Sequence, residues 1–123
     1  MNSIGKKGEE VVATWLMEQG YDIIEKNWRV RTGEIDIIAL EKDILVFIEV
    51  KTLPNTTLES LSMLVGCSKQ AKIAQTAKYF LQSNRQYHKL EMRFDVVVLK
   101  SNPFMSTKHK ILHIKNAFGD CNG

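Results

Sequence analysis

The sequence predicts an α/β domain in which a central mixed β-sheet is flanked by helices, in the order αβββαββ. Two observations carry this prediction. Apolar residues recur at helical spacing in two segments, and five other short segments are rich in β-branched residues and bounded by turn residues. The chain has 123 residues, of which 44% are hydrophobic. That length can bury one core, so we expect residues 1–123 to form a single domain.

The N-terminal half predicts one helix followed by a meander of strands. The helix is expected over residues 6–19, because Val12, Ala13 and Leu16 follow the spacing of a buried stripe and Gly20 supplies a stop. Three apolar segments separated by short turns then predict strands over residues 21–30, 34–40 and 44–51.

The C-terminal half predicts a second helix and two further strands. Residues 52–66 read as a loop. A helix is expected over residues 68–83, with Ile73, Ala77 and Phe80 on one face. The last two strands are expected over residues 93–100 and 110–115.

Charge and cysteine content limit the setting. The formal net charge is +3, a mild excess that permits an anionic partner. No apolar run approaches the roughly 18 residues of a membrane span, and no apolar stretch follows the N-terminal lysines as in a secretory signal. Cys67 and Cys121 form no CxxC pair. We therefore expect reduced thiols, no membrane association and a cytoplasmic location.

One acidic residue stands out because it interrupts a strand that is otherwise apolar. Glu49 lies in the run Ile44–Val50, and a buried carboxylate is costly unless it is paired or binds a metal. If the second and third strands form an antiparallel hairpin, Asp36 can face Glu49 with Cβ atoms about 5 Å apart. A divalent cation would relieve the repulsion between these carboxylates, and Mg²⁺ commonly takes one or two of them.

Two more residues complete a candidate catalytic set. Lys51 follows Glu49 on the same face, roughly 7 Å along the strand, where it could activate water or stabilise charge at phosphorus. Glu9 heads the buried stripe of the first helix and would point toward the sheet. Each has a plainer reading. Glu9 could simply favour a helix N-terminus, and Glu49 could form a cross-strand salt bridge with Lys51.

The order of motifs resembles a known family. Asp36 followed by Glu49-Val50-Lys51 resembles the PD-(D/E)XK nuclease motif, and Glu9 matches the glutamate of its preceding helix. Over nearly its whole length the chain is similar to the YraN family of small endonuclease-like proteins, itself similar to Holliday-junction resolvases. The ordered segments that carry the resemblance are Gly8-Glu9, Asn27-Trp28-Arg29, Gly33-Glu34-Ile35-Asp36-Ile37-Ile38-Ala39, Val46-Phe47-Ile48-Glu49-Val50-Lys51, Val65 with Lys69, Arg93-Phe94-Asp95-Val96-Val97 and Asn116-Ala117-Phe118.

The resemblance implies a restriction-endonuclease-like core with one Mg²⁺ or Mn²⁺ site. Asp36 and Glu49 would be metal ligands, Lys51 the catalytic lysine and Glu9 an accessory acid, while Glu34 would support the site or bind metal through water. The chain departs from the pattern at two places. Ile35 replaces the proline of the motif, and Thr52-Leu53-Pro54 stands where a basic residue often follows the lysine.

Basic residues supply a candidate nucleic-acid surface. Arg29 and Arg31 flank a turn and could grip phosphates, or could form a solvated edge that discourages strand pairing. Lys69, Gln70 and Lys72 open the second helix, where a solvated helix start is the alternative. Residues 69–100 are the most basic part of the chain. Asp95 lies among them, and we interpret it as a buried structural partner for Arg93 or Arg29.

Two functions of different classes follow. The first is a Mg²⁺-dependent endonuclease that hydrolyses DNA phosphodiester bonds, with branched or damaged DNA as the implied substrate. Cutting both strands of a junction would require a homodimer, because one domain supplies one site. The second is a non-catalytic nucleic-acid-binding protein that keeps the nuclease fold within a DNA repair or uptake complex. A weaker third reading is a structural domain in which Glu49 and Lys51 merely pair.

Overall fold

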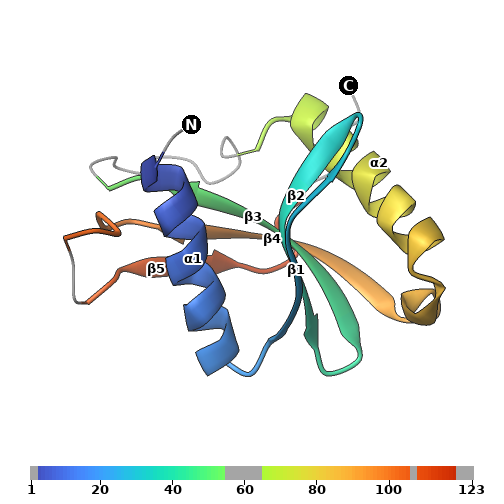
Figure 1. The fold of residues 1–123 in the computed structure, drawn as a ribbon, viewed down its shortest axis with the longest axis horizontal. Coiled ribbons are helices and arrows are strands. Elements are labelled where there is room, and N and C mark those ends of the chain that lie inside the picture. The colour runs from blue at the N-terminus through green and yellow to red at the C-terminus, as the bar shows by residue number, and fades with distance from the viewer. Residues whose placement is uncertain (1–2, 55–64, 106–107, 119–123) are drawn as a thin grey trace.

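Five strands form one sheet in the spatial order β1-β2-β3-β4-β5, and a helix packs on each of its faces (Figure 1). The structure is a computed structural model that describes residues 3–54, 65–105 and 108–118. Along the chain its elements are α1 (Ser3–Glu18), β1 (Asp22–Val30), β2 (Gly33–Glu41), β3 (Ile44–Thr52), α2 (Cys67–Ser83), a short 3-10 turn η2 (Arg85–Tyr87), β4 (Glu91–Leu99) and β5 (Ile111–Ile114).

The sheet is mixed. β1, β2 and β3 form an antiparallel meander, β3 and β4 are parallel, and β5 pairs antiparallel with β4. A parallel pair needs a crossover connection, and α2 lies in the segment that joins β3 to β4. The predicted αβββαββ order is therefore confirmed, with element ends that differ by three residues or fewer. The 3-10 turn was not predicted, and most of the predicted loop at 52–66 lies outside the described residues.

The two faces of the sheet form separate cores. On one face α1 buries Val12 and Leu16 against Ile37, Ile48 and other side chains of the strands. On the opposite face α2 buries Ile73 and Phe80 with the alternate strand residues, such as Ile38, Phe47 and Val96. Because strand side chains alternate between faces, the central strands β2 and β3 are buried on both sides.

The cysteine expectation is wrong at one position. Cys67, which opens α2, is disulfide-bonded rather than a reduced thiol. Cys121 lies outside the described residues. Among the described helices none is long and apolar enough to cross a membrane.

Two glycines allow the helices to approach the sheet closely. A Cβ atom on Gly8 in α1 would clash with the Thr52 hydroxyl at the end of β3. A Cβ atom on Gly33 in β2 would clash with the Thr76 hydroxyl in α2. A larger residue at either position would force the threonine or the helix to shift, so each glycine permits the close approach. Both contacts border the ends of β2 and β3 that carry Asp36 and Glu49.

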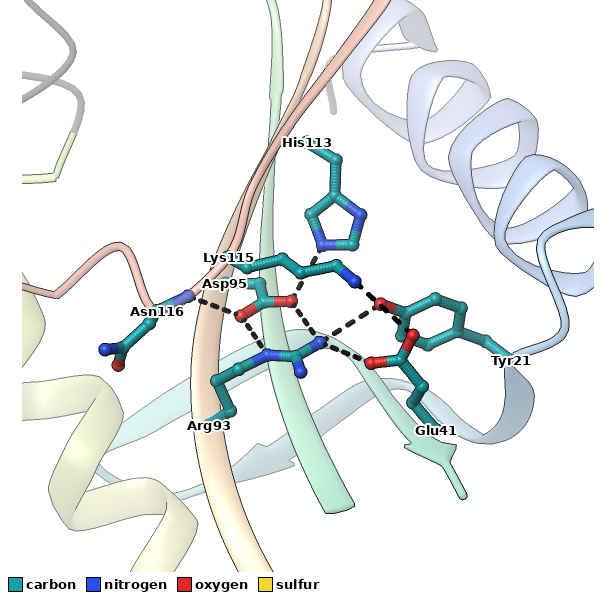
Figure 2. A network of polar contacts seen from close by, with 7 residues as sticks. All are labelled: Tyr21, Glu41, Arg93, Asp95, His113, Lys115 and Asn116. Atoms are coloured by element: carbon teal, nitrogen blue, oxygen red, sulfur yellow. Dashed lines mark hydrogen bonds and ion pairs between the residues drawn. The ribbon is translucent and has the colours of Figure 1, made fainter. Parts of the chain in front are cut away.

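A polar network on the α1 face holds β4, β5 and the β2 end together (Figure 2). Asp95 in β4 is fully buried and accepts two hydrogen bonds from the Arg93 guanidinium, over 2.8 and 2.9 Å. His113 Nε2 in β5 lies 2.7 Å from the same carboxylate, and the Asn116 N–H donates to it over 2.9 Å. The interpretation of Asp95 as a structural partner of Arg93 is confirmed.

Arg93 extends this network along the same face of the sheet to Tyr21 and to the end of β2. Its Nη2 lies 3.0 Å from Glu41 Oε1 and 3.0 Å from the hydroxyl of Tyr21 (Figure 2). Burial raises the pKa of Tyr21 to about 12. Burial also opposes ionisation of Asp95, but the hydrogen bonds from His113, Arg93 and the backbone outweigh it and lower the pKa of Asp95. The charges inside this network are thus fully compensated.

Replacing Asp95 by Asn should destabilise the fold by about 3 kcal/mol, because it leaves the buried Arg93 guanidinium without its main partner. Urea denaturation at pH 7 measures the change, with Asp43→Asn in the exposed β2–β3 turn as the control. The pKa of Asp95 is lowered in the fold. The difference in unfolding free energy between wild type and Asp95→Asn should therefore be largest at pH values above the ordinary pKa range of a carboxyl group, and it should decline as the pH falls through that range. An Asp95→Asn variant as stable as Asp43→Asn would contradict the structural role.

Candidate functional site

Asp36 and Glu49 lie together where the β2–β3 ladder ends. The last paired residues of that ladder are Ile37 and Ile48, so Asp36 and Glu49 are the next residues on the two strands. There the Asp36 side chain replaces a backbone partner: its Oδ2 accepts a hydrogen bond from the Val50 N–H over 2.8 Å. The predicted juxtaposition of the two carboxylates across the hairpin is present in the structure.

Both carboxylates are removed from water. Asp36 is 6% exposed and Glu49 is 7% exposed. Burial, followed by the charge of Glu49 and a hydrogen bond with it, raises the pKa of Asp36 to about 8, against the opposing bond from Val50 N–H. At neutral pH the charge of Glu49 therefore opposes ionisation of Asp36, which is the repulsion that the sequence predicts.

Glu9 reaches the same site from α1. Burial raises the pKa of Glu9, the nearby charges of Glu34 and Glu49 raise it further, and hydrogen bonds with Asn27 and Asp36 oppose the shift. The plainer reading, a glutamate that only favours a helix N-terminus, does not fit, because α1 begins at Ser3 and Glu9 lies beyond its first turn. Gly8 explains the approach: its missing side chain lets this part of α1 contact the end of β3.

A lysine from α2 completes the site. Lys69 Nζ lies 3.2 Å from Glu49 Oε1 and forms an ion pair in which Glu49 is buried and Lys69 is half-exposed. Burial works against the charged amine, but Glu49 outweighs it and the pKa of Lys69 is raised. The alternative pair of Glu49 with Lys51 is not formed in the described residues, where the ion-pair partner of Glu49 is Lys69. Lys51 itself lies half-buried two residues beyond Glu49 on β3.

The site opens into a small pocket of about 130 Å³ between β2, β3 and α2. Its lining consists of Gly33, Glu34, Asp36, Glu49, Lys69, Lys72 and Ile73. A second, more open hollow of about 350 Å³ shares Gly33 and Glu34 and is lined by Arg29 and Arg31 of the β1–β2 hairpin. Acidic groups therefore form the floor of the first pocket, and basic groups from two elements surround it.

The remaining predicted residues have other partners. Glu34 is exposed and its Oε2 lies 2.7 Å from Arg29 Nε, so it borders the site without being buried in it. Gln70 in α2 donates from Nε2 to the carbonyl of Val65, which precedes the helix, and it is not among the pocket-lining residues. Arg93, counted with the basic segment at 69–100, belongs to the Asp95 network and does not contribute to a basic surface.

The donor set suits a hard divalent cation held by few protein ligands. Within the described ranges, no three His, Cys, Asp or Glu side chains converge as a ready-made metal site. Mg²⁺, however, commonly binds proteins through one or two carboxylates and keeps several waters. Asp36 and Glu49 are both buried, and their mutual repulsion contributes to the raised pKa of Asp36. A bound cation would relieve that repulsion. Asp36 and Glu49 therefore fit as the two protein ligands of a Mg²⁺ or Mn²⁺ ion.

Comparison with known proteins places the chain in a family. The model of the uncharacterised protein family UPF0102 matches residues 8–99. The chain belongs to UPF0102. A UPF0102 protein from Treponema denticola is 56% identical, covering 98% of this chain and 98% of its own. A UPF0102 protein from Treponema pallidum is 50% identical, covering 95% and 93%. The UPF0102 protein TTE1452 from Caldanaerobacter subterraneus is 39% identical, covering 94% of each.

The UPF0102 match spans the whole candidate site. It begins at Gly8, beside Glu9, and ends with β4, so Asp36, Glu49, Lys51 and Lys69 all lie inside it. The family name carries no reaction. What the site does must therefore be argued from its own geometry.

Asp36→Asn should stabilise the metal-free protein at and above neutral pH. Because the folded pKa of Asp36 is about 8 and the ordinary value is 3.8, the folded state holds a proton that the unfolded state has lost between these values. Wild-type stability should therefore fall as the pH rises from about 4 to about 8, and an asparagine removes this decline while still accepting the Val50 hydrogen bond.

Thermal melting in chelator from pH 4 to pH 9 measures this effect. Glu34→Gln is the matched control, because Glu34 lines the same pocket but is exposed. The gap between Asp36→Asn and wild type should widen with pH and level off above about pH 8. A gap that is constant across this range would show that the Asp36 carboxylate is not strained by its neighbours.

Proposed function

We propose that this protein is a metal-dependent endonuclease that hydrolyses DNA phosphodiester bonds. The observation that carries the proposal is the pair of buried carboxylates, Asp36 and Glu49, that face each other beside lysines in a pocket open to solvent. Carboxylates that repel each other in a sheet are costly for folding, and binding of a catalytic cation is a physical reason to keep them. The resemblance of the motif order to the PD-(D/E)XK nucleases and the YraN family supports the same reading.

Each residue has a defined task in this proposal. Asp36 and Glu49 would hold Mg²⁺ or Mn²⁺, with Glu9 as an accessory acid that orients Asp36. The bound metal supplies a Lewis acid for the phosphoryl oxygen and lowers the pKa of a coordinated water. Lys51 follows the metal ligand on β3 and would hold the attacking water or stabilise the negative charge that develops at phosphorus.

The basic rim supplies the contacts to the nucleic-acid backbone. Lys72 in α2 is exposed and lines the pocket, while Arg29 and Arg31 line the adjoining hollow. Phosphate contacts of this kind fix the position of a substrate without reading its sequence. The site thus suits recognition by DNA structure, with branched or damaged DNA as the proposed substrate. The proposed location is the cytoplasm. Cutting two strands would use two sites, one from each copy of a homodimer.

A second function fits the same surface. A nucleic-acid-binding protein could keep this fold within a DNA repair or uptake complex without cutting. The observation that favours it is the Lys69–Glu49 ion pair, because that pair neutralises one acid of the site without any metal. Cleavage and metal binding by the purified protein distinguish the two functions.

The wild-type protein should cut plasmid or branched DNA with Mn²⁺ or Mg²⁺ and not with chelator. Glu49→Gln and Lys51→Ala should each reduce the cleavage rate at least about 100-fold, because they remove a metal ligand and the group acting on water or phosphate. Gel assays of product formation measure the rates, with Lys78→Ala on the exposed face of α2 as the control. Cleavage that survives both site substitutions would come from a contaminant or another site.

Saturating Mn²⁺ should raise the melting temperature of the wild-type protein, because an ion that binds only the folded state stabilises it. Asp36→Asn should lose most of this shift, whereas Glu34→Gln should keep it, since Glu34 is exposed and paired with Arg29. Differential scanning fluorimetry with and without Mn²⁺ gives the comparison. An unchanged shift in Asp36→Asn would rule out Asp36 as a metal ligand.

A further inference from the structure

Lys69 occupies a position that the stability of its own helix does not explain. It lies in the first turn of α2, where the helix dipole disfavours a positive charge. Gly66 caps this helix without a side-chain hydrogen bond, and the first turn holds no acidic residue. What stabilises the ammonium is Glu49 on β3, 3.2 Å away. The lysine therefore serves the site rather than the helix.

The ion pair conflicts with a metal at the same carboxylate. Mg²⁺ sits about 2.0–2.1 Å from its oxygen ligands, so a cation on Glu49 would lie within a few ångströms of the Lys69 ammonium. The pocket has only about 130 Å³, and two other acids line it. The metal would also use Asp36, and Glu34 is already paired with Arg29, so neither offsets that repulsion. Metal and ammonium are thus alternative partners for Glu49.

Lys69 can leave without disturbing the fold. Its side chain is 50% exposed, against 7% for Glu49, and lysine carries its charge on a flexible four-carbon stem. It lines the same pocket as Lys72, which borders solvent. A released ammonium therefore stays at the pocket wall, where a phosphate group entering the pocket would meet it.

We propose that Lys69 is an exchange residue: it neutralises Glu49 in the metal-free protein, and metal binding displaces it to bind a phosphate of the substrate. This inference rests on the proposed metal-dependent function. It makes Lys69 a phosphate-binding and positioning residue whose contact becomes available only with metal. Metal and nucleic acid then raise each other's affinity, because each stabilises the arrangement in which Lys69 has left Glu49.

Mn²⁺ binding without nucleic acid tests the exchange directly. Lys69→Met removes the competing charge and keeps the length of the side chain, so calorimetry should find Mn²⁺ bound about fivefold more tightly than by wild type. Lys69→Arg should bind Mn²⁺ more weakly, because a guanidinium grips a carboxylate more firmly than an ammonium does. Lys72→Met is the matched control: it removes a charge from the same pocket without touching Glu49, and its effect should stay below about twofold.

Binding of a labelled four-way DNA junction tests the second half of the exchange. Ca²⁺ replaces Mn²⁺ to prevent cutting. With Ca²⁺, Lys69→Met should reduce the magnitude of the slope of log affinity against log salt concentration by about one, which corresponds to the loss of one phosphate contact. Without metal it should leave the slope unchanged. Lys72→Met should lower the slope in both conditions.

The outcomes separate this inference from the proposed function. If neither wild type nor Lys69→Met binds Mn²⁺, the metal-dependent function fails and the exchange fails with it. If all variants bind Mn²⁺ equally, or Lys72→Met tightens binding as much as Lys69→Met, the exchange is wrong and the metal site stands. If the Lys69→Met slope changes equally with and without Ca²⁺, Lys69 is a constitutive contact and not an exchange residue.

Discussion

The repulsion between the buried carboxylates of Asp36 and Glu49 is the constraint on which the arrangement of the site depends. The other buried positions of β2 and β3 are apolar residues that pack on both faces of the sheet. At this one point two acids meet, and the neighbouring groups respond to them: the Val50 N–H turns to Asp36, and Lys69 turns to Glu49. These contacts reduce the repulsion without removing it, since the pKa of Asp36 remains raised to about 8.

A second buried aspartate in the same sheet shows what full compensation looks like. Asp95 is as inaccessible to solvent as Asp36, with exposed fractions of 0% and 6%, yet its pKa is lowered because a guanidinium, an imidazole and a backbone N–H converge on it (Figure 2). The fold is thus able to satisfy a buried carboxylate completely, and it does so on the α1 face. Asp36 lies on the other face, beside a pocket, and its pKa stays raised although it accepts the Val50 hydrogen bond. This contrast is the strongest physical argument that its site serves binding rather than stability.

How far the sequence predicts this molecule depends on the range of the contact. The hairpin partners Asp36 and Glu49 could be paired from sequence, because a tight turn fixes the register of the two strands that it joins. Lys69 could be named as a basic residue, but its pairing with Glu49 depends on where α2 lies over the sheet, which no local pattern encodes. For the same reason the sequence left Asp95 with two candidate arginines, and the register and network selected Arg93 over Arg29.

Two glycines mark close helix–sheet contacts that hydrophobic periodicity does not reveal. A glycine inside a helix costs about 1 kcal/mol relative to alanine, so Gly8 within α1 signals a requirement beyond helix formation. The structure identifies that requirement as the contact with Thr52, which brings Glu9 to the carboxylates. Gly33 likewise admits Thr76 and brings the Lys69–Lys72 turn of α2 over the site.

The distribution of charge also sets an order of events for the proposed chemistry. The net charge of +3 averages an acidic pocket floor with a basic rim drawn from α2 and the β1–β2 hairpin. A phosphate attracted by the rim would still meet the carboxyl oxygens of the acidic floor beneath it. Only a cation at the floor reverses that repulsion, and the same cation would compete with Lys69 for Glu49. On this proposal metal binds first, and the group that had been holding the acid then becomes a group that holds the substrate.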